Sequence, residues 1–119
     1  MNPFELDIDL VAGDDETIEF LFEEDDGTPL DLTGRTFWME VRKTPASVGA
    51  ADCTFTCTVP PPAGDGVVIA TAVAADTLGL TAGKGYWWSL LQTTVSEPDG
   101  ETLVWGRVNV IPKVTKIGT

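Results

Sequence analysis

Two clusters of acidic residues are the first candidates for chemistry in this chain of 119 residues. Carboxylates gather at Asp14-Asp15-Glu16 and again at Glu23-Glu24-Asp25-Asp26. Clustered carboxylate oxygens can bind a hard cation such as Ca²⁺, and a pair of carboxylates serves many glycosidases. Neither cluster has the spaced ligands of an EF-hand loop. We therefore expect an acidic surface that faces solvent or a partner, with neither a metal ion nor a cofactor bound there.

Histidine is absent from the sequence. Its absence removes the commonest general base, the usual zinc ligand and every Ser–His or Cys–His nucleophile pair. No glycine-rich phosphate-binding run is present either. The carboxylates of Glu5, Asp7, Asp9 and Glu19 have the spacing of residues on the solvent face of strands. The sequence thus predicts no catalytic residues, and we expect a protein without enzymatic activity.

The two cysteines, Cys53 and Cys57, are four positions apart with Phe55 between them. On one strand this spacing separates them by roughly 13 Å, at about 3.3 Å per residue. A disulfide requires Cα atoms within about 7 Å of one another. We expect two small, reduced thiols beside an inward Phe55, as in a protein made in a reducing cytosol, with a metal-binding Cys pair as the alternative.

The tryptophans are the second possible source of function. Trp87 and Trp88 are neighbours, so they must point to opposite faces of one strand. Trp38 and Trp105 share faces with Glu40 and Arg107, so one of them could also lie outside the core. An exposed tryptophan either covers the apolar stems of Lys and Arg or anchors a partner, and Trp87 or Trp88 is the better candidate for an anchor.

The negative charge is concentrated at one end of the sequence. Residues 5–31 contain 12 acids, no Lys or Arg precedes Arg35, and the formal net charge is −12. Such a surface would repel phosphates, so we expect neither nucleic acid nor an anionic membrane as a partner. It suits a basic protein surface instead. The candidate contact residues are Glu5, Asp7, Asp9, Glu19, Trp87, Trp88, and, in a mildly basic tail, Lys113 and Lys116.

Period-two alternation of apolar and polar residues predicts about seven strands. They are expected at residues 4–10, 17–22, 35–43, 51–59, 67–73, 86–94 and 102–111. Residues 74–80 read as one short helical turn. The list predicts an all-β fold, an antiparallel β-sandwich over residues 1–111 with a tail at residues 112–119. Its expected core residues are Phe20, Phe22, Phe37, Met39, Val41, Phe55 and Val108.

Residues 30–34, Leu-Asp-Leu-Thr-Gly, read as a corner between two strands. We expect Leu30 and Leu32 to close one end of the sandwich, Asp31 or Thr33 to cap backbone amides, and Gly34 to make the bend. No apolar run is long enough to span a membrane, and the first residues have no feature of a classical secretory signal.

Several turn and corner motifs, spread over nearly the whole chain, resemble those of small tailed-phage proteins. They are GDDET at 13–17, DDGTPLDLTGRTF at 25–37, VRKTP at 41–45, AADT at 74–77, LTAGKGY at 80–86, PDGE at 98–101, GRVNV at 106–110 and PKVT at 112–115. The chain is similar in these blocks to the Ig-like N-terminal domain of phage baseplate upper proteins and to stand-alone virion proteins like it. The resemblance implies an antiparallel Ig-like β-sandwich.

The same resemblance implies a function. It suggests a structural component of a bacteriophage particle, made in the host cytoplasm and located in the virion. In that setting the protein would be a docking or adaptor module of the tail, baseplate or neck, present in multiple copies by particle symmetry and bound to other phage structural proteins. One alternative is a capsid decoration (cement) protein that clamps shell subunits. Another is a carbohydrate-binding module, although no row of aromatic residues is spaced along one strand face.

Overall fold

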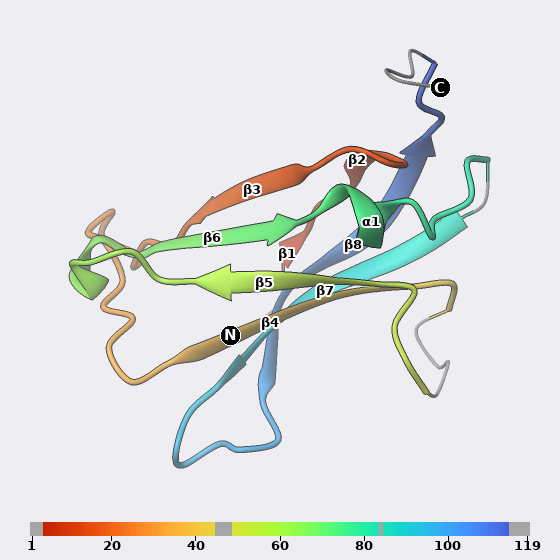
Figure 1. Cartoon of the computed structure of the whole chain (residues 1–119). Coiled ribbons are helices and arrows are strands. Elements are labelled where there is room, and N and C mark those ends of the chain that lie inside the picture. The colour runs from red at the N-terminus through yellow and green to blue at the C-terminus, as the bar shows by residue number, and fades with distance from the viewer. Residues whose placement is uncertain (1–3, 45–48, 84, 115–119) are drawn as a thin grey trace.

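Eight strands form one curled sheet in the part of the chain that the structure describes, residues 4–44, 49–83 and 85–114 (Figure 1). The structure is a computed structural model. The strands are β1 (Phe4–Glu5), β2 (Ile8–Val11), β3 (Glu16–Leu21), β4 (Thr36–Arg42), β5 (Cys53–Thr58), β6 (Val67–Ala72), β7 (Gly85–Thr93) and β8 (Glu101–Ile111). Their order is β1-β8-β7-β4-β5-β6-β3, and β2 also pairs with β8. The prediction of a mainly β fold is confirmed.

The sheet folds over along β5. The first half of β5 pairs with β4, where Phe55 lies opposite Met39, and the second half pairs with β6, where Cys57 lies opposite Ala70. As a result β3 and β6 lie over β4, β7 and β8 as a second layer (Figure 1). The inward side chains of both layers meet between them, as the alternation of the sequence requires.

The core is built largely from the residues expected there. Phe20, Phe37, Met39, Val41, Phe55 and Val108 are buried, and Phe22 is partly buried and packs against them. Phe20 stacks on Trp88 across the two layers, with ring centroids 5.7 Å apart. Phe22 stacks on Phe37 at 6.1 Å.

The first segment departs from the expectation of a single strand in a purely antiparallel sheet. It forms two short strands, β1 and β2, and both pair with β8 in parallel. At the break between them, the Arg107 amide donates to the Asp7 carboxylate at 3.0 Å, and the Trp88 indole N–H donates to the Leu6 carbonyl at 2.8 Å. Gly106 leaves the space that the Leu6 carbonyl occupies. The sheet is therefore mixed.

Two short helical segments connect the strands. The expected helical turn is α1 (Ala74–Thr77), whose first amide is capped by the Asp15 carboxylate at 2.7 Å. The buried hydroxyl of Thr77 donates to the Asp14 carbonyl and accepts from the Gly13 amide, which ties α1 to the turn between β2 and β3. The second segment, η1 (Ala63–Asp65), is a single 3₁₀ turn between β5 and β6.

The corner at residues 30–34 has the expected structure. Leu32 is fully buried and Leu30 packs against the core. The Asp31 carboxylate accepts hydrogen bonds from the amide and the hydroxyl of Thr33, at 3.0 and 2.7 Å. Gly34 has a φ of 77°, which an L side chain rarely adopts.

β8 ends at Ile111, and residues 112–114 continue outside the sheet with exposed side chains. The rest of the expected tail, including Lys116, lies outside the described residues. In the described part of the chain, no helix is long and apolar enough to cross a membrane.

Candidate docking site

The two neighbouring tryptophans have opposite environments. Trp88 is 2% exposed and belongs to the core, so the expectation that it could anchor a partner at the surface is wrong. Trp87 lies half-buried on the outer face of β7, as the alternation requires. Alternation shows that the two rings diverge, but only the register with β4 and β8 decides which ring points inward.

Three tryptophans lie together on the outer face of β4, β7 and β8, which we call the tryptophan face. Trp87 stacks on Trp105 with ring centroids 5.7 Å apart, and the Arg107 guanidinium lies 4.4 Å from the centre of the Trp87 ring. Trp38 is 55% exposed, and its indole N–H donates to the Thr93 hydroxyl at 3.0 Å. Trp87, Trp105 and Arg107 thus contact one another, whereas the Trp38 ring remains largely exposed.

The acidic residues named as contacts lie on two separate edges. Glu5 is opposite Trp105 and Asp9 is opposite Asn109, both on the outer side of the β1–β2 edge. Glu19 is exposed on β3, at the other end of the strand order. Among the described residues, no cation pairs with any of these three carboxylates. Lys113, the described member of the basic tail, forms an ion pair with Asp14 at 2.9 Å.

Part of the acidity serves the fold itself. The carboxylates of Asp7 and Asp15 cap backbone amides as described above, and Glu16 accepts from the Val11 amide at 3.1 Å. In the two turns that follow β3, hydrogen bonds from the hydroxyl and the amide of Thr28 lower the pKa of Asp26, and those from Thr33 lower the pKa of Asp31. These acids therefore remain charged around the end of β3 even in mildly acidic solution.

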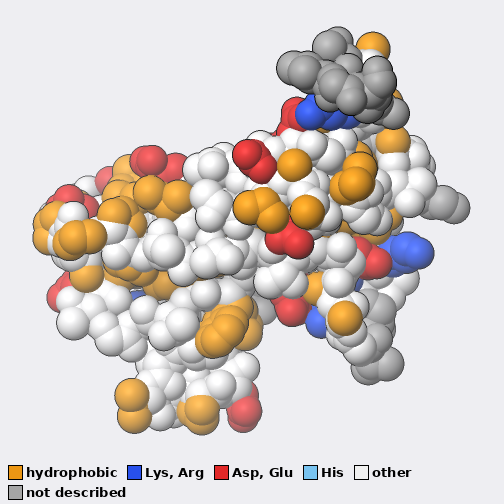
Figure 2. Space-filling model, viewed as in Figure 1, with side chains coloured by type: hydrophobic (Ala, Val, Ile, Leu, Met, Phe, Trp, Pro, Cys, Tyr) orange, Lys and Arg blue, Asp and Glu red, His pale blue; other side chains and the backbone are white. Residues whose placement is uncertain are grey.

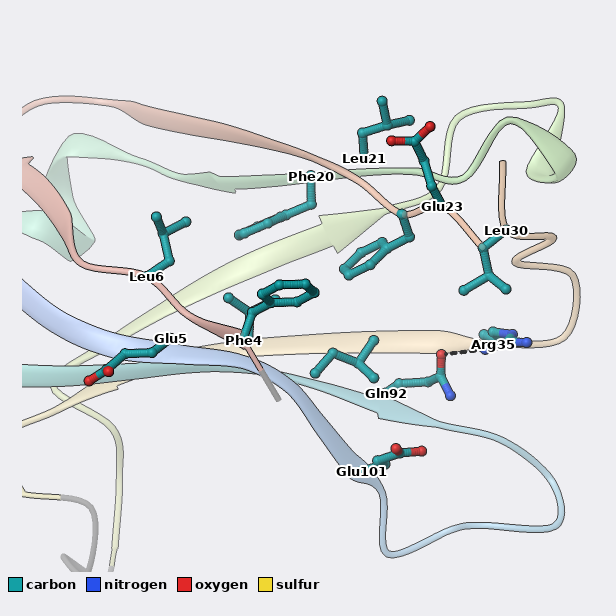
Figure 3. Close-up of a pocket in the computed structure, with 13 residues that line it drawn as sticks. Phe4, Glu5, Leu6, Phe20, Leu21, Glu23, Leu30, Arg35, Gln92 and Glu101 are labelled. Atoms are coloured by element: carbon teal, nitrogen blue, oxygen red, sulfur yellow. Dashed lines mark hydrogen bonds between the residues drawn. The ribbon is translucent and has the colours of Figure 1, made fainter. Parts of the chain in front are cut away.

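An apolar groove lies between the two acidic edges. It has a volume of about 440 Å³ and opens where β1 and the end of β3 face each other across the two layers. Figure 3 shows Phe4 of β1 and Leu6, which follows this strand, on the side of the groove opposite Phe20 of β3. We call it the edge groove; its lining is Phe4, Glu5, Leu6, Phe20, Leu21, Phe22, Glu23, Leu30, Arg35, Gln92, Glu101, Leu103 and Val104.

The edge groove leaves large apolar side chains open to solvent. Phe4 is 73% exposed and Leu6 is 49% exposed, although both belong to the apolar side of the first predicted strand. Farther along the same segment, Leu10 is completely buried. Sequence alternation identifies all three as inward-facing, but it does not reveal that the layers separate before they reach β1 and leave its side chains uncovered.

One end of the edge groove is polar. The Arg35 guanidinium donates to the side-chain oxygen of Gln92 at 2.9 Å (Figure 3). Gln92 is buried and lies opposite Glu101 in the pairing of β7 with β8. This end thus holds a cation, an amide and a carboxylate close together, while Glu5 and Glu23 line the groove elsewhere.

The surface shows the same combination of acidic and apolar groups. Figure 2 shows hydrophobic side chains at the end of the molecule where β3 ends and β6 begins, with acidic side chains among them. Exposed Leu21 belongs to this region, and in Figure 3 its side chain points away from the groove. An apolar surface bordered by charged groups is typical of a protein–protein contact.

Neither cysteine has the environment of a reactive thiol. Burial raises the pKa of Cys53 and of Cys57 to about 11, so both thiols are protonated and poorly nucleophilic at neutral pH. The carboxylate of Asp76 adds to this effect at Cys53. Among the residues that the structure describes, no group of three or more His, Cys, Asp or Glu side chains is arranged to hold a metal ion.

A comparison with known protein families found no match, and a comparison with curated protein sequences found none either. The similarity to phage baseplate upper proteins therefore stays a prediction from the sequence. The site is defined by its geometry alone: an apolar groove and two strand edges, each with carboxylates that have no cation beside them in the part of the chain that the structure describes.

Proposed function

We propose that this protein is a non-enzymatic docking module that binds a basic partner surface across its two acidic strand edges. The observation that supports this most is the edge groove, where exposed Phe4 and Leu6 lie between Glu5 on one edge and Glu19 on the other, two carboxylates with no cation beside them among the described residues. Crowded like charges repel, and this repulsion falls when Lys or Arg of a partner stands opposite. Apolar burial would supply affinity, and the charge would supply rapid, specific association.

We further propose that the module is a structural component of a bacteriophage particle, in the tail, baseplate or neck, and that its curled sheet is an Ig-like sandwich. The turn motifs of the sequence support the phage assignment. Support for the sandwich comes from the two layers that enclose the core. Multiple copies, arranged by particle symmetry, would each present the same acidic edges to other virion proteins.

Mass spectrometry of purified virions, with heads and tails separated, tests this assignment. We expect the chain in the tail fraction at a constant ratio to other tail proteins. Recovery with heads alone would support the alternative of a capsid decoration protein. Absence from both fractions would refute a virion role.

Charge reversal tests the docking edges themselves. Asp9→Lys with Glu19→Lys should reduce incorporation into particles. The wild-type protein should also associate more slowly with its basic partner as the salt concentration rises. Asp7 is left unchanged, because its carboxylate holds the Arg107 amide. The matched control, Glu97→Lys with Asp99→Lys, changes the net charge equally in the exposed turn between β7 and β8. Equal incorporation of both double variants would show that the acidic edges are only a solubility device.

A further inference from the structure

We infer that the edge groove receives an extended segment of a partner protein in which apolar residues alternate with Lys or Arg, and that this segment adds to β3 as a further strand. The inference rests on the proposed docking function and specifies the partner's local structure and composition. Three observations support it within the described residues: a strand edge with no partner strand, an uncovered apolar groove beside that edge, and the carboxylate of Glu19 on the same strand, which has no cation beside it.

The outer edge of β3 has backbone groups available for pairing. β3 is the last strand in the order, and within the described residues only β6 pairs with it. The Phe22 amide donates to the Gly66 carbonyl on the β6 side at 2.8 Å. In an antiparallel strand the backbone N–H and C=O groups of successive residues point to opposite sides, so those of every second residue of β3 point away from β6. These residues are Thr17, Glu19 and Leu21.

The inner side of an added strand would cover the edge groove. A strand beside β3 would direct alternate side chains inwards, next to Phe20. Those side chains would meet Phe4 of β1 and Leu6, which follows it, across the groove (Figure 3). Apolar residues at these positions would bury the exposed phenylalanine and leucine. The inward positions of the partner segment should therefore be Val, Ile, Leu or Phe.

The outer side of the same strand determines its charge. The outward residues would lie beside Glu19 of β3 and close to Glu23, which follows it. Opposite charges on neighbouring strands stabilise a pair, and like charges directly opposite destabilise it. Lys or Arg is therefore favoured at these positions. A second copy of this chain is disfavoured as the occupant, because its own β3 would bring Glu19 and Glu23 against the same residues.

Binding of designed peptides tests the inference directly. The probe is a peptide of about seven residues with blocked ends in which Val and Lys alternate, a length that matches the six residues of β3. The first control peptide has the same composition with the Val residues grouped together, and the second has Glu in place of Lys. We expect the alternating peptide to bind at least about tenfold more tightly than the grouped peptide, and the Glu peptide not to bind.

Amide hydrogen exchange locates the bound peptide. The amides of Thr17, Glu19 and Leu21 should exchange more slowly in its presence, while amides of the tryptophan face stay unchanged. Protection of those three amides supports strand addition. Equal binding of the alternating and grouped peptides, or protection confined to other strands, would overturn it, because charge alone would then account for the binding.

A pair of protein variants tests the groove. Phe4→Ala with Leu6→Ala removes two side chains that are largely exposed, so the fold should be retained while peptide affinity falls about tenfold. The control, Val73→Ala with Leu78→Ala, removes the exposed apolar side chains that flank α1 on either side and should leave affinity unchanged. Circular dichroism would verify that both variants are folded. Equal affinity of the two would refute the groove as the binding site.

The results separate this inference from the proposed function. Loss of particle incorporation on charge reversal at Asp9 and Glu19, together with no effect at Phe4 and Leu6, would uphold the docking function and overturn strand addition. Specific peptide binding by a protein that is absent from virions would uphold strand addition and refute the virion role.

Discussion

The tryptophan face and the edge groove both expose aromatic and charged side chains. They differ in how many of these side chains contact other groups of the protein. On the tryptophan face, Trp87 lies against Trp105 and Arg107, and Glu40 pairs with Arg42 at 3.1 Å. In the edge groove, Phe4 projects into solvent, and Glu5 in its lining has no cation beside it in the described part of the chain.

This difference indicates which surface would gain more free energy from binding a partner. A surface whose groups already contact one another gains little from a partner, since binding would exchange existing contacts for new ones. In the edge groove, by contrast, a partner would bury exposed apolar side chains and bring cations close to carboxylates that lack them among the described residues. Residue type alone favours the tryptophans as anchors, whereas the contacts favour the edge groove.

The largest expected effect separates the two adjacent tryptophans. Trp88→Ala should lower the free energy of unfolding by about 3–5 kcal/mol, because it removes a buried ring that stacks on Phe20. Trp38→Ala, on the tryptophan face, should cost less than about 1 kcal/mol. Chemical denaturation measures both values. Similar losses would mean that the tryptophan face is as much a structural element as the core.

The next effect concerns the attachment of β1, which carries one wall of the edge groove. A Cβ at position 106 would overlap the Leu6 carbonyl, so Gly106→Ala should displace β1 and cost about 1–3 kcal/mol. The indole N–H of Trp88, which donates to that carbonyl, should show a changed NMR shift. Gly64→Ala is the control, because nothing lies near its added methyl group. An unchanged indole signal would contradict this account of the groove wall.

A smaller effect tests whether the contact between Arg107 and Trp87 on the tryptophan face stabilises the protein. A double-mutant cycle between Arg107→Ala and Trp87→Leu should give a coupling free energy of about 0.5–1 kcal/mol, as expected for an exposed cation–π contact. A coupling of zero would mean that Arg107 and Trp87 are available to a partner, and the contrast between the two surfaces would weaken.

The smallest effect is the electrostatic cost of the acidic edges in the free protein. Raising the salt concentration should increase the free energy of unfolding by a few tenths of a kcal/mol, because it screens repulsion among the carboxylates. Asp9→Asn with Glu19→Gln should reduce this salt dependence more than Glu97→Gln with Asp99→Asn, which removes the same number of charges, as measured by thermal unfolding. The same salt dependence in both variants would place the repulsion elsewhere on the molecule.

Local alternation predicted the strands and most of the core. The strand expected at residues 35–43 is β4 (Thr36–Arg42), and its inward side chains Phe37, Met39 and Val41 are buried as expected. The corner at residues 30–34 could be predicted equally well, because turns depend on neighbouring residues. The Asp31 carboxylate accepts a hydrogen bond from Thr33, and the positive φ of Gly34 bends the backbone.

Features that depend on distant pairing were not accessible in this way. Alternation did not reveal that the first segment breaks at Leu6 and Asp7 and pairs in parallel with β8. It also missed an irregularity in the pairing of β7 with β8, where Leu103 and Val104 are both buried although they are neighbours. An extra residue of this kind shifts the phase of a strand, and no local pattern marks it.

The edge groove combines both kinds of information. Its apolar residues were assigned to the correct side of their strands, but their exposure results from the distance between two strand edges. That distance depends on the curl of the whole sheet. The acidic residues were found by their composition, yet their division between the β1–β2 edge and β3 required the strand order.

The pairing of β1 and β2 with β8 also has a consequence for how the chain folds. The contact between Asp7 and Arg107 spans 100 positions, so the first strands have no lasting partner until the final strand is in place. Contacts of such long range slow folding, to a scale of about milliseconds to seconds in comparable β proteins. During synthesis the apolar side of the N-terminal segment should therefore remain exposed until β8 has been made. Its alternating carboxylates would then prevent it from pairing with identical segments of other nascent chains, which gives the acidity a role before any partner is met.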